Sequence, residues 1–230
     1  MEFVDRLLLL VHIVAGFGSL TVFFVPAFAR KGGELHNRAG RWYVRGMWTV
    51  VVTAVGLSVI NYLQGMPAFA LFLGFLAFLT ARPLYYGVAV IKHKRLPTAK
   101  MRQIDTALAA VLALGGPYLI GMGLGFWGPQ GQPAATVFGV LGLLNSWPFF
   151  LRRWTGREKA YSWLHLHIEG LVITAIAAFT AFFVFGGARL FGHLFAGPVA
   201  IAVWSAPTVL GLAFSRYYKG KIGRKQTVAA

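Results

Sequence analysis

Long apolar stretches separated by short polar segments run along the whole chain. About 20 consecutive apolar residues in an α-helix cross the hydrocarbon core of a bilayer, which is about 30 Å thick. A membrane barrel would instead show segments of about ten residues with alternating hydrophobicity, a pattern that this chain lacks. The sequence therefore predicts an all-α membrane protein with seven spans, at residues 4–29, 42–63, 68–91, 103–126, 134–151, 161–185 and 194–215.

These spans leave no room for a second domain, so we predict one domain over residues 1–230 that ends in a short basic tail at 216–230. Glycines occur inside several spans, for example Gly116 and Gly139. Small residues allow close packing of helices in lipid, and they also accompany broken helices around the substrate site of a transporter. We favour close packing and keep the broken-helix interpretation as the alternative.

Basic residues are concentrated in four clusters, at 30–45, 92–102, 152–159 and 216–225. The connections at 64–67, 127–133 and 186–193 are nearly free of charge. Because cytoplasmic loops carry the excess of Lys and Arg, this alternation predicts an external N-terminus and a cytoplasmic C-terminus. We expect the protein in a bacterial cytoplasmic membrane, with the lipid bilayer and its anionic head groups as partners of the basic loops.

The composition agrees with this assignment and excludes several classes of function. Hydrophobic residues make up 57% of the 230 residues and charged residues 12%, whereas soluble domains carry about 25% charged residues. The net charge of +16 does not indicate nucleic-acid binding, because the basic residues lie at span ends. The chain has no cysteine, which excludes disulfides, thiolate metal sites and covalently attached haem. No catalytic motif indicates an enzyme.

Three ionisable residues lie well inside the predicted spans: His12, Arg82 and Glu169. Ionisable groups at such depth are rare and usually face a bundle interior, a water-filled path or a ligand. At a rise of about 1.5 Å per residue, Arg82 and Glu169 lie at similar depths. A contact between these opposite charges is the least costly way to hold either in lipid, so we predict that they form a pair.

Two histidines precede Glu169 on the predicted sixth span. His165 and Glu169 are one helical turn apart and share a face, whereas His167 points in roughly the opposite direction. The three side chains therefore cannot all bind one metal ion on a regular helix. His165 and Glu169 are candidates either for two ligands of a metal ion or for a proton relay, and the alternative is that the histidines lie at the membrane interface.

His12 shares its helix face with small residues, among them Gly16 and Ser19. Such a stripe makes room for another helix or for the face of a haem. An axial haem ligand needs a neutral imidazole whose other nitrogen is hydrogen-bonded. No second histidine lies at a matching depth, so the alternatives are haem b with His12 or His165 as its single axial ligand, or no haem.

The first predicted loop contains Lys31, His36 and Arg38 among glycines, and the second contains His93. Basic groups on a glycine-rich turn can hold an anion, and they also satisfy the tendency of cytoplasmic loops to be basic. His36, His93 and His165 would all face the cytoplasm. Their spacing matches no metal-binding motif, so we predict no metal site.

The beginning of the chain resembles a bacterial family of multi-pass membrane proteins that is classified as a domain of unknown function. The resemblance covers about the first fifth of the chain, from His12 with the following Ala-Gly to a loop in which Lys31, Gly32, His36 and Gly40 occur in the family's order. It implies a protein of the same class, and it brings no activity with it.

Three classes of function remain. The first is a small-solute or proton-coupled transporter or channel, with Arg82 as counter-ion, Glu169 and His165 as proton carriers and His12 as an outer gate. The second is a haem- or quinone-binding redox protein, such as an accessory factor of a respiratory complex. The third is a structural membrane subunit. We favour the first; partner subunits and a homo-oligomer both remain open.

Overall fold

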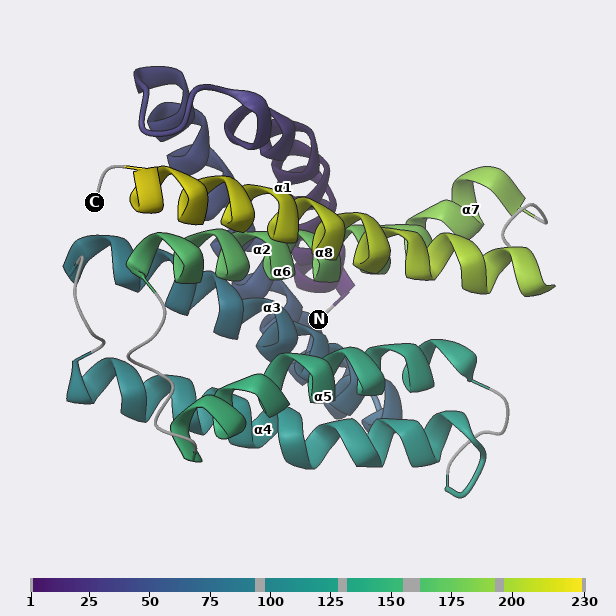
Figure 1. Cartoon of the computed structure of the whole chain (residues 1–230). Helices are drawn as coiled ribbons and strands as arrows, with labels where there is room; N and C mark the ends of the chain where they lie inside the picture. Colours follow the sequence, from purple (N-terminus) through teal and green to yellow (C-terminus); the bar gives the residue numbers. More distant parts are fainter. Residues whose placement is uncertain (1, 94–97, 128–131, 155–161, 193–196, 229–230) are drawn as a thin grey trace. The chain divides into compact units, whose positions relative to one another are not determined.

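The computed structural model describes residues 2–93, 98–127, 132–154, 162–192 and 197–228, and every element in these residues is a helix (Figure 1). The prediction of an all-α chain is therefore confirmed. In chain order the elements are α1 (Glu2–Phe28), α2 (Glu34–Leu63), α3 (Pro67–His93), α4 (Ala99–Gly123), α5 (Pro133–Trp154), α6 (Trp163–Ala181), the π-helical segment η2 (Phe182–Gly187), α7 (Ala188–Phe191) and α8 (Gly197–Val228).

Six helices in the described residues are long and apolar enough to cross a membrane. They comprise Glu2–Phe28, Glu34–Leu63, Pro67–Lys92, Ala99–Gly123, Trp163–Gly187 and Val199–Lys221. The remaining long helix, α5, has 22 residues and lies where the fifth span is predicted. The lengths of the apolar runs thus locate the helices, because each run reflects the thickness of the hydrocarbon that a helix has to cross.

The largest differences from the predicted spans are in α2 and α8, which extend well beyond them. α2 begins at Glu34, well before the predicted span at 42–63, so His36 and Arg38 lie on a helix and not in a loop. Gly32, with a φ of 77°, makes the tight turn between α1 and α2, a conformation that favours glycine. α8 continues to Val228, so the predicted tail is helical as far as that residue.

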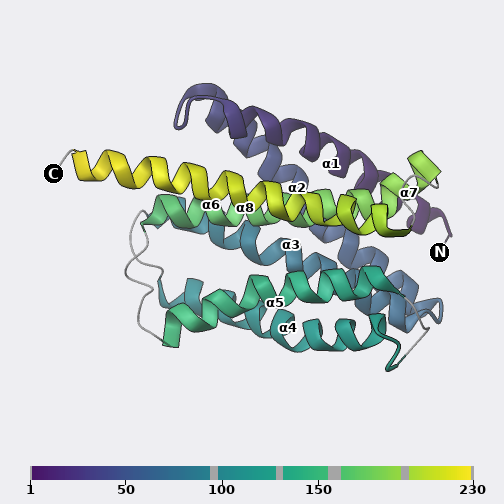
Figure 2. The same cartoon turned by 45° about the vertical axis from the view of Figure 1, so that its right-hand side comes forward.

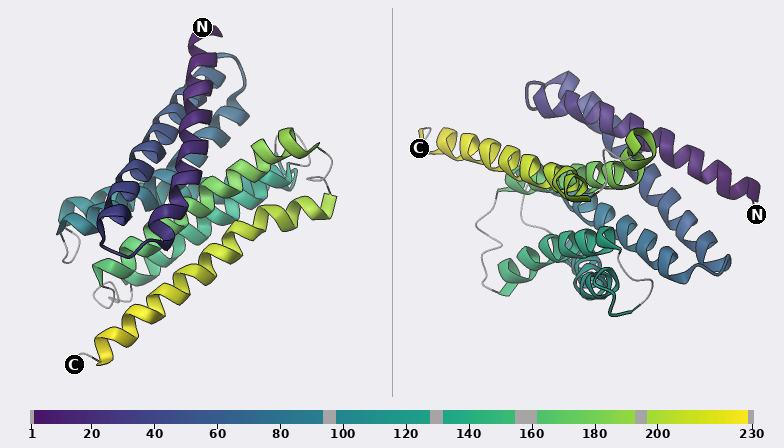
Figure 3. Two further views of the ribbon diagram at one scale, coloured as in Figure 1. Left: turned by 90° about the horizontal axis from the view of Figure 1, so that it is seen from above. Right: turned by 90° about the vertical axis from the view of Figure 1, so that its right-hand side faces the viewer.

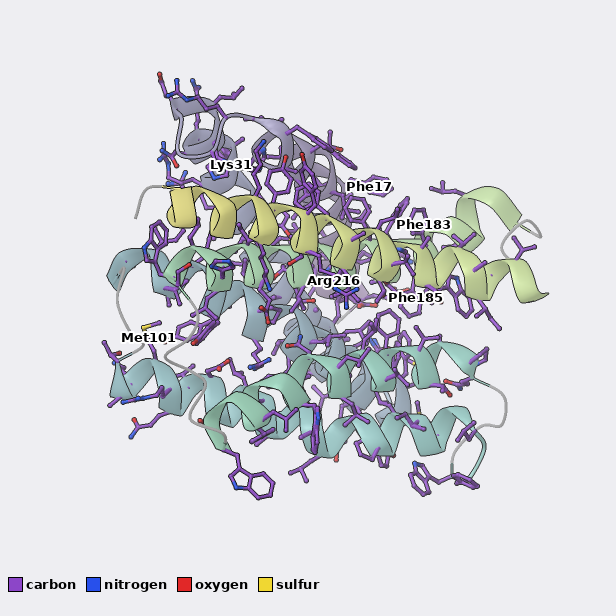
Figure 4. The ribbon with its side chains drawn as sticks, viewed as in Figure 1. Phe17, Lys31, Met101, Phe183, Phe185 and Arg216 are labelled. Atoms are coloured by element: carbon purple, nitrogen blue, oxygen red, sulfur yellow. The ribbon has the colours of Figure 1, made fainter. Side chains whose placement is uncertain are left out.

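The predicted sixth span ends in an irregular segment. After Ala181 the backbone changes from an α-helix to the π-helix η2, which carries Phe183 and Phe185 (Figure 4). The short helix α7 follows directly. A π-helix is rare and is usually found as a local insertion within an α-helix, which is why an apolar run alone does not predict it.

The chain forms two compact units, each made of separate stretches of sequence. The first comprises Met1–Arg82 and Ala107–Trp147, and the second comprises Pro83–Thr106 and Pro148–Ala230. In the first unit α1 and α2 lie side by side and antiparallel (Figure 2). In the second, α6 and α8 lie alongside each other (Figure 3).

Glycines bring helix backbones into contact in both units. In the first unit, a Cβ atom on Gly139 would lie 2.6 Å from the carbonyl oxygen of Gly116, so α4 and α5 touch there. In the second unit, a Cβ atom on Gly170 would lie 2.6 Å from both Gly87 Cα and the Pro83 carbonyl oxygen. These contacts support close packing as the role of the glycines within the spans.

Alanine at Gly170 is expected to destabilise the second unit, because the added methyl group would collide with the backbone of α3. We expect a loss of about 1–3 kcal/mol, the usual effect of overpacking, measured as a lower apparent melting temperature in detergent. Gly40→Ala is the matched control, since no atom lies within 4 Å of a Cβ atom at that helical position. Equal melting temperatures for the two variants would contradict the close contact of α3 with α6.

Candidate functional site

Arg82 lies on α3 in the first unit and is 8% exposed. Its Nη1 donates a hydrogen bond to Asn145 Oδ1 at 2.5 Å and another to the backbone carbonyl of Asn145. Asn145, on α5, is also buried, and its Nδ2 donates to the Leu79 carbonyl oxygen at 3.2 Å. One asparagine therefore holds the guanidinium of Arg82 and also bonds to the backbone of α3.

Pro83 explains why the Leu79 carbonyl needs a partner. A proline in a helix has no N–H group, so the carbonyl four residues earlier loses its usual hydrogen bond. Pro83 lies inside α3, and the carbonyl that it leaves without a helical donor belongs to Leu79. The Asn145 amide replaces the missing donor. The sequence analysis did not identify Asn145, although an amide within an apolar run, together with a proline in a neighbouring span, is a usable signal.

Glu169 lies on α6 in the second unit, where its Oε2 is 2.6 Å from Lys219 Nζ on α8. The two side chains are 19% and 24% exposed, so the ion pair is only partly buried. The sequence analysis missed Lys219 because it assigned this residue to the tail beyond the last span. Since α8 continues without a break through Lys219, the ammonium group stays beside α6.

The predicted pair of Arg82 with Glu169 joins residues of different units. Each residue has a partner within its own unit: Asn145 for Arg82 and Lys219 for Glu169. The pair between Arg82 and Glu169 stays a prediction.

The histidines of α6 make different contacts. His165 Nδ1 lies 2.5 Å from the Ser162 hydroxyl, which also accepts the backbone N–H of His165 and so caps the helix. His167 Nδ1 donates to the Gly87 carbonyl oxygen on α3 at 2.8 Å, next to the contact between Gly87 and Gly170. His165 therefore belongs to the start of α6, whereas His167 links α6 to α3.

His12 is linked to α2. Its Nδ1 lies 2.9 Å from Thr53 Oγ1, and the Thr53 hydroxyl donates to the Thr49 carbonyl at 2.7 Å. A hydroxyl has only one proton to donate, so Thr53 accepts the bond and Nδ1 of His12 carries the hydrogen. In the neutral ring Nε2 then bears the lone pair. The stripe of small residues beside His12 is in contact with α2, since a Cβ atom on Gly46 would overlap Ser19 Oγ.

Lys31 lies at the end of α1 (Figure 4), where it shares an acceptor, the Pro26 carbonyl, with His36. Lys31 Nζ donates to the Pro26 carbonyl at 2.8 Å and to the Ala27 carbonyl, and His36 Nδ1 donates to the Pro26 carbonyl at 2.9 Å. The last carbonyl groups of a helix have no partner within it, so these side chains cap α1. Partial burial lowers the pKa of the Lys31 ammonium.

The other predicted candidates of the basic segments are not part of this cap. Arg38 is exposed on the first turns of α2. His93 is the last residue of α3, and its side chain lies outside the described residues. The possible grouping of His36, His93 and His165 therefore stays untested, and the described side chains contain no group of three potential metal ligands.

Asp105 is a buried acid that the sequence analysis did not single out. It lies on α4 and is 1% exposed. Met101, one turn earlier on the same face, packs with Val90 and Leu166 in the core of the second unit. Asp105 is thus directed towards the same side of α4 as this core. The sequence analysis passed over Asp105 because it lies near the start of a predicted span, where charged residues are common. The signal was its rarity, since the whole chain has only 6 acidic residues.

The described polar groups thus form two sets. The first unit holds His12 with Thr53, Arg82 with Asn145, and the cap made by Lys31 and His36. The second unit holds the ion pair of α6 and α8 with the histidines of α6. No protein-family model, curated protein or solved structure matches this chain.

Proposed function

We propose that this protein is an integral protein of a bacterial cytoplasmic membrane and that it belongs to the multi-pass family that its first fifth resembles. Six candidate spans together with α5 support seven crossings. The basic clusters then favour an external N-terminus and a cytoplasmic C-terminus. In this orientation the exposed guanidinium groups of Arg38 and Arg41 lie among the head groups of anionic lipids.

Its function in our proposal is transport of protons, or of a small solute together with protons. The observation that carries this proposal is the ion pair between Glu169 and Lys219, at 2.6 Å and only partly buried. Uptake of a proton by the carboxylate cancels one charge of the pair and removes the electrostatic attraction between Glu169 on α6 and Lys219 on α8. A group that changes a contact between two helices when it binds a proton suits a carrier.

The other polar residues have supporting roles. His165, one turn from Glu169 on α6, is a second proton carrier. Arg82 supplies a fixed positive charge, since two hydrogen bonds to Asn145 hold its guanidinium in place. In this proposal His12 is the outer gate, and its contact with Thr53 orients the ring.

Proteoliposomes provide the test of this function. The purified protein is reconstituted with a trapped pH-sensitive dye, and an acid jump is applied with valinomycin and K⁺ present to balance charge. We expect a faster change of internal pH than in protein-free liposomes, either alone or when a panel of amino acids, sugars, organic acids and inorganic anions is supplied. Rates equal to those of protein-free liposomes under every condition would contradict the proposal.

A haem- or quinone-binding role is the second candidate, and the geometry of His12 favours it over the purely structural role. A hydrogen bond from Nδ1 to an oxygen is how axial imidazoles are usually oriented, and Thr53 receives such a bond here. An absorption spectrum of the purified protein, before and after addition of haem b, separates the candidates. A Soret band that His12→Ala removes would select the cofactor role over transport.

A further inference from the structure

Two buried hydroxyl groups lie where α1 meets α2, and neither has a hydrogen-bond partner among the described residues. Ser19, on α1, is 3% exposed, and Tyr43, on α2, is 1% exposed. Hydrogen-bonding groups that are buried without a partner are costly, and in lipid no bulk water is present to satisfy them. We therefore expect a ligand that forms hydrogen bonds with these two hydroxyls.

The contacts around the two residues place them on neighbouring turns of one helix–helix interface. Ser19 faces Gly46, where a Cβ atom would overlap its hydroxyl oxygen. Phe23, one turn further along α1, packs against Tyr43 with ring centroids 5.4 Å apart. Tyr43 and Gly46 are three residues apart on α2, which corresponds to a rise of about 4.5 Å. Ser19 and Tyr43 therefore belong to the same part of the interface between α1 and α2.

The Ser19 hydroxyl also departs from the usual behaviour of serine within a helix. Serine in such a position commonly donates to the carbonyl four residues earlier, which here belongs to Ala15. Ser19 Oγ makes no hydrogen bond with any described group. Thr21, on the same helix, does make the usual bond, to the Phe17 carbonyl at 2.9 Å. The contrast indicates that the Ser19 hydroxyl forms a hydrogen bond with a partner in the interface between α1 and α2.

We propose that a water molecule is bound between Ser19 and Tyr43. Water has two donors and two acceptors, and buried water typically makes about three hydrogen bonds to groups that lack other partners. The site lies between the pair of His12 with Thr53 and the cap made by Lys31 and His36. The water would be one polar contact within the interface of α1 with α2, between these two polar groups of residues. This site does not depend on the proposed transport function.

Solid-state NMR tests the site directly. The full-length protein is labelled with ¹³Cζ-tyrosine, which marks 8 positions, and is reconstituted in liposomes; the Tyr43 signal is assigned by its loss in Tyr43→Phe. We expect magnetisation transfer from water to Tyr43 in the wild type and a clear loss of it in Ser19→Ala. Tyr62, which is 63% exposed, is the internal control and should be unaffected. No transfer to Tyr43, or unchanged transfer in Ser19→Ala, would overturn the proposal.

Thermal unfolding in detergent gives an independent test, because the direction in which Tyr43→Phe shifts the apparent melting temperature depends on whether water is bound. If the Tyr43 hydroxyl binds water, Tyr43→Phe removes a satisfied hydrogen bond and lowers the apparent melting temperature by about 2–4 °C. The effects of Ser19→Ala and Tyr43→Phe should not add, because they share one ligand. Ser58→Ala, which removes a bond to the Ala70 carbonyl at 2.7 Å, should add with Tyr43→Phe. An unchanged or higher melting temperature in Tyr43→Phe would show that no water molecule binds the Tyr43 hydroxyl, and it would overturn the proposal.

Discussion

Glutamine in place of Glu169 is expected to reduce proton-coupled flux to the rate of protein-free liposomes. The amide has nearly the same shape as the carboxylic acid, but it cannot take up or release a proton. The ion pair to Lys219, now 2.6 Å long, would be replaced permanently by a neutral contact. The measurement is the initial rate of internal pH change after an acid jump, normalised to the amount of protein reconstituted.

Two further variants make this result specific. Glu34→Gln removes the same charge at an exposed position in the first turn of α2, and it should leave the flux unchanged. Glu169→Asp keeps an ionisable group and should restore part of the flux. If Glu169→Gln transports at the rate of the wild type, Glu169 is not the proton carrier. If Glu169→Asp and Glu169→Gln both lose flux and melting temperature equally, the ion pair has only a structural role.

The largest loss of stability is expected for Asn145→Ala. This variant removes a hydrogen bond to the charged guanidinium of Arg82 and another to the Leu79 carbonyl. Bonds to charged groups contribute about 1.5–3 kcal/mol and neutral ones about 0.5–1.5 kcal/mol. We therefore expect a loss of about 3 kcal/mol, or about 6–12 °C in melting temperature for a chain of this size.

A second substitution tests why Asn145 matters. In Pro83→Ala the backbone N–H of residue 83 returns and can bond to the Leu79 carbonyl, so Asn145→Ala should cost about 1 kcal/mol less in that background. Asn61→Ala is the control, because the bond that buried Asn61 donates among the described residues goes to the Leu57 carbonyl within its own helix. The proposed role of Asn145 would be wrong if Asn145→Ala and Asn61→Ala had equal melting temperatures. It would also be wrong if Asn145→Ala caused the same loss of stability with and without Pro83→Ala.

The helices within lipid follow from the sequence, whereas their extensions do not. α3, at Pro67–His93, closely matches the span predicted at 68–91 because an apolar run reports the hydrocarbon that it crosses. The first turns of α2 and the last turns of α8 are polar, and hydropathy does not detect a helix that continues into water. The π-helix η2 is a short local irregularity, and it leaves no periodic signal in the sequence.

The candidate site shows the same division. His12, Arg82 and Glu169 are conspicuous in the sequence because ionisable groups are rare in apolar runs. Their partners Thr53, Asn145 and Lys219 are not conspicuous. Thr53 and Asn145 carry no charge, and Lys219 lies beyond the last predicted span. Partners across a helix interface depend on rotation and register, which hydropathy does not encode.

The interleaving of the two units has a consequence for biogenesis. α3, α4 and α5 each begin in one unit and end in the other, and Arg82 and Pro83 are consecutive residues assigned to different units. The ribosome therefore delivers every segment of the first unit by Trp147, while the second still lacks α6 and α8. During synthesis, the parts of α3 and α4 that belong to the second unit are therefore made before α6 and α8, which complete that unit.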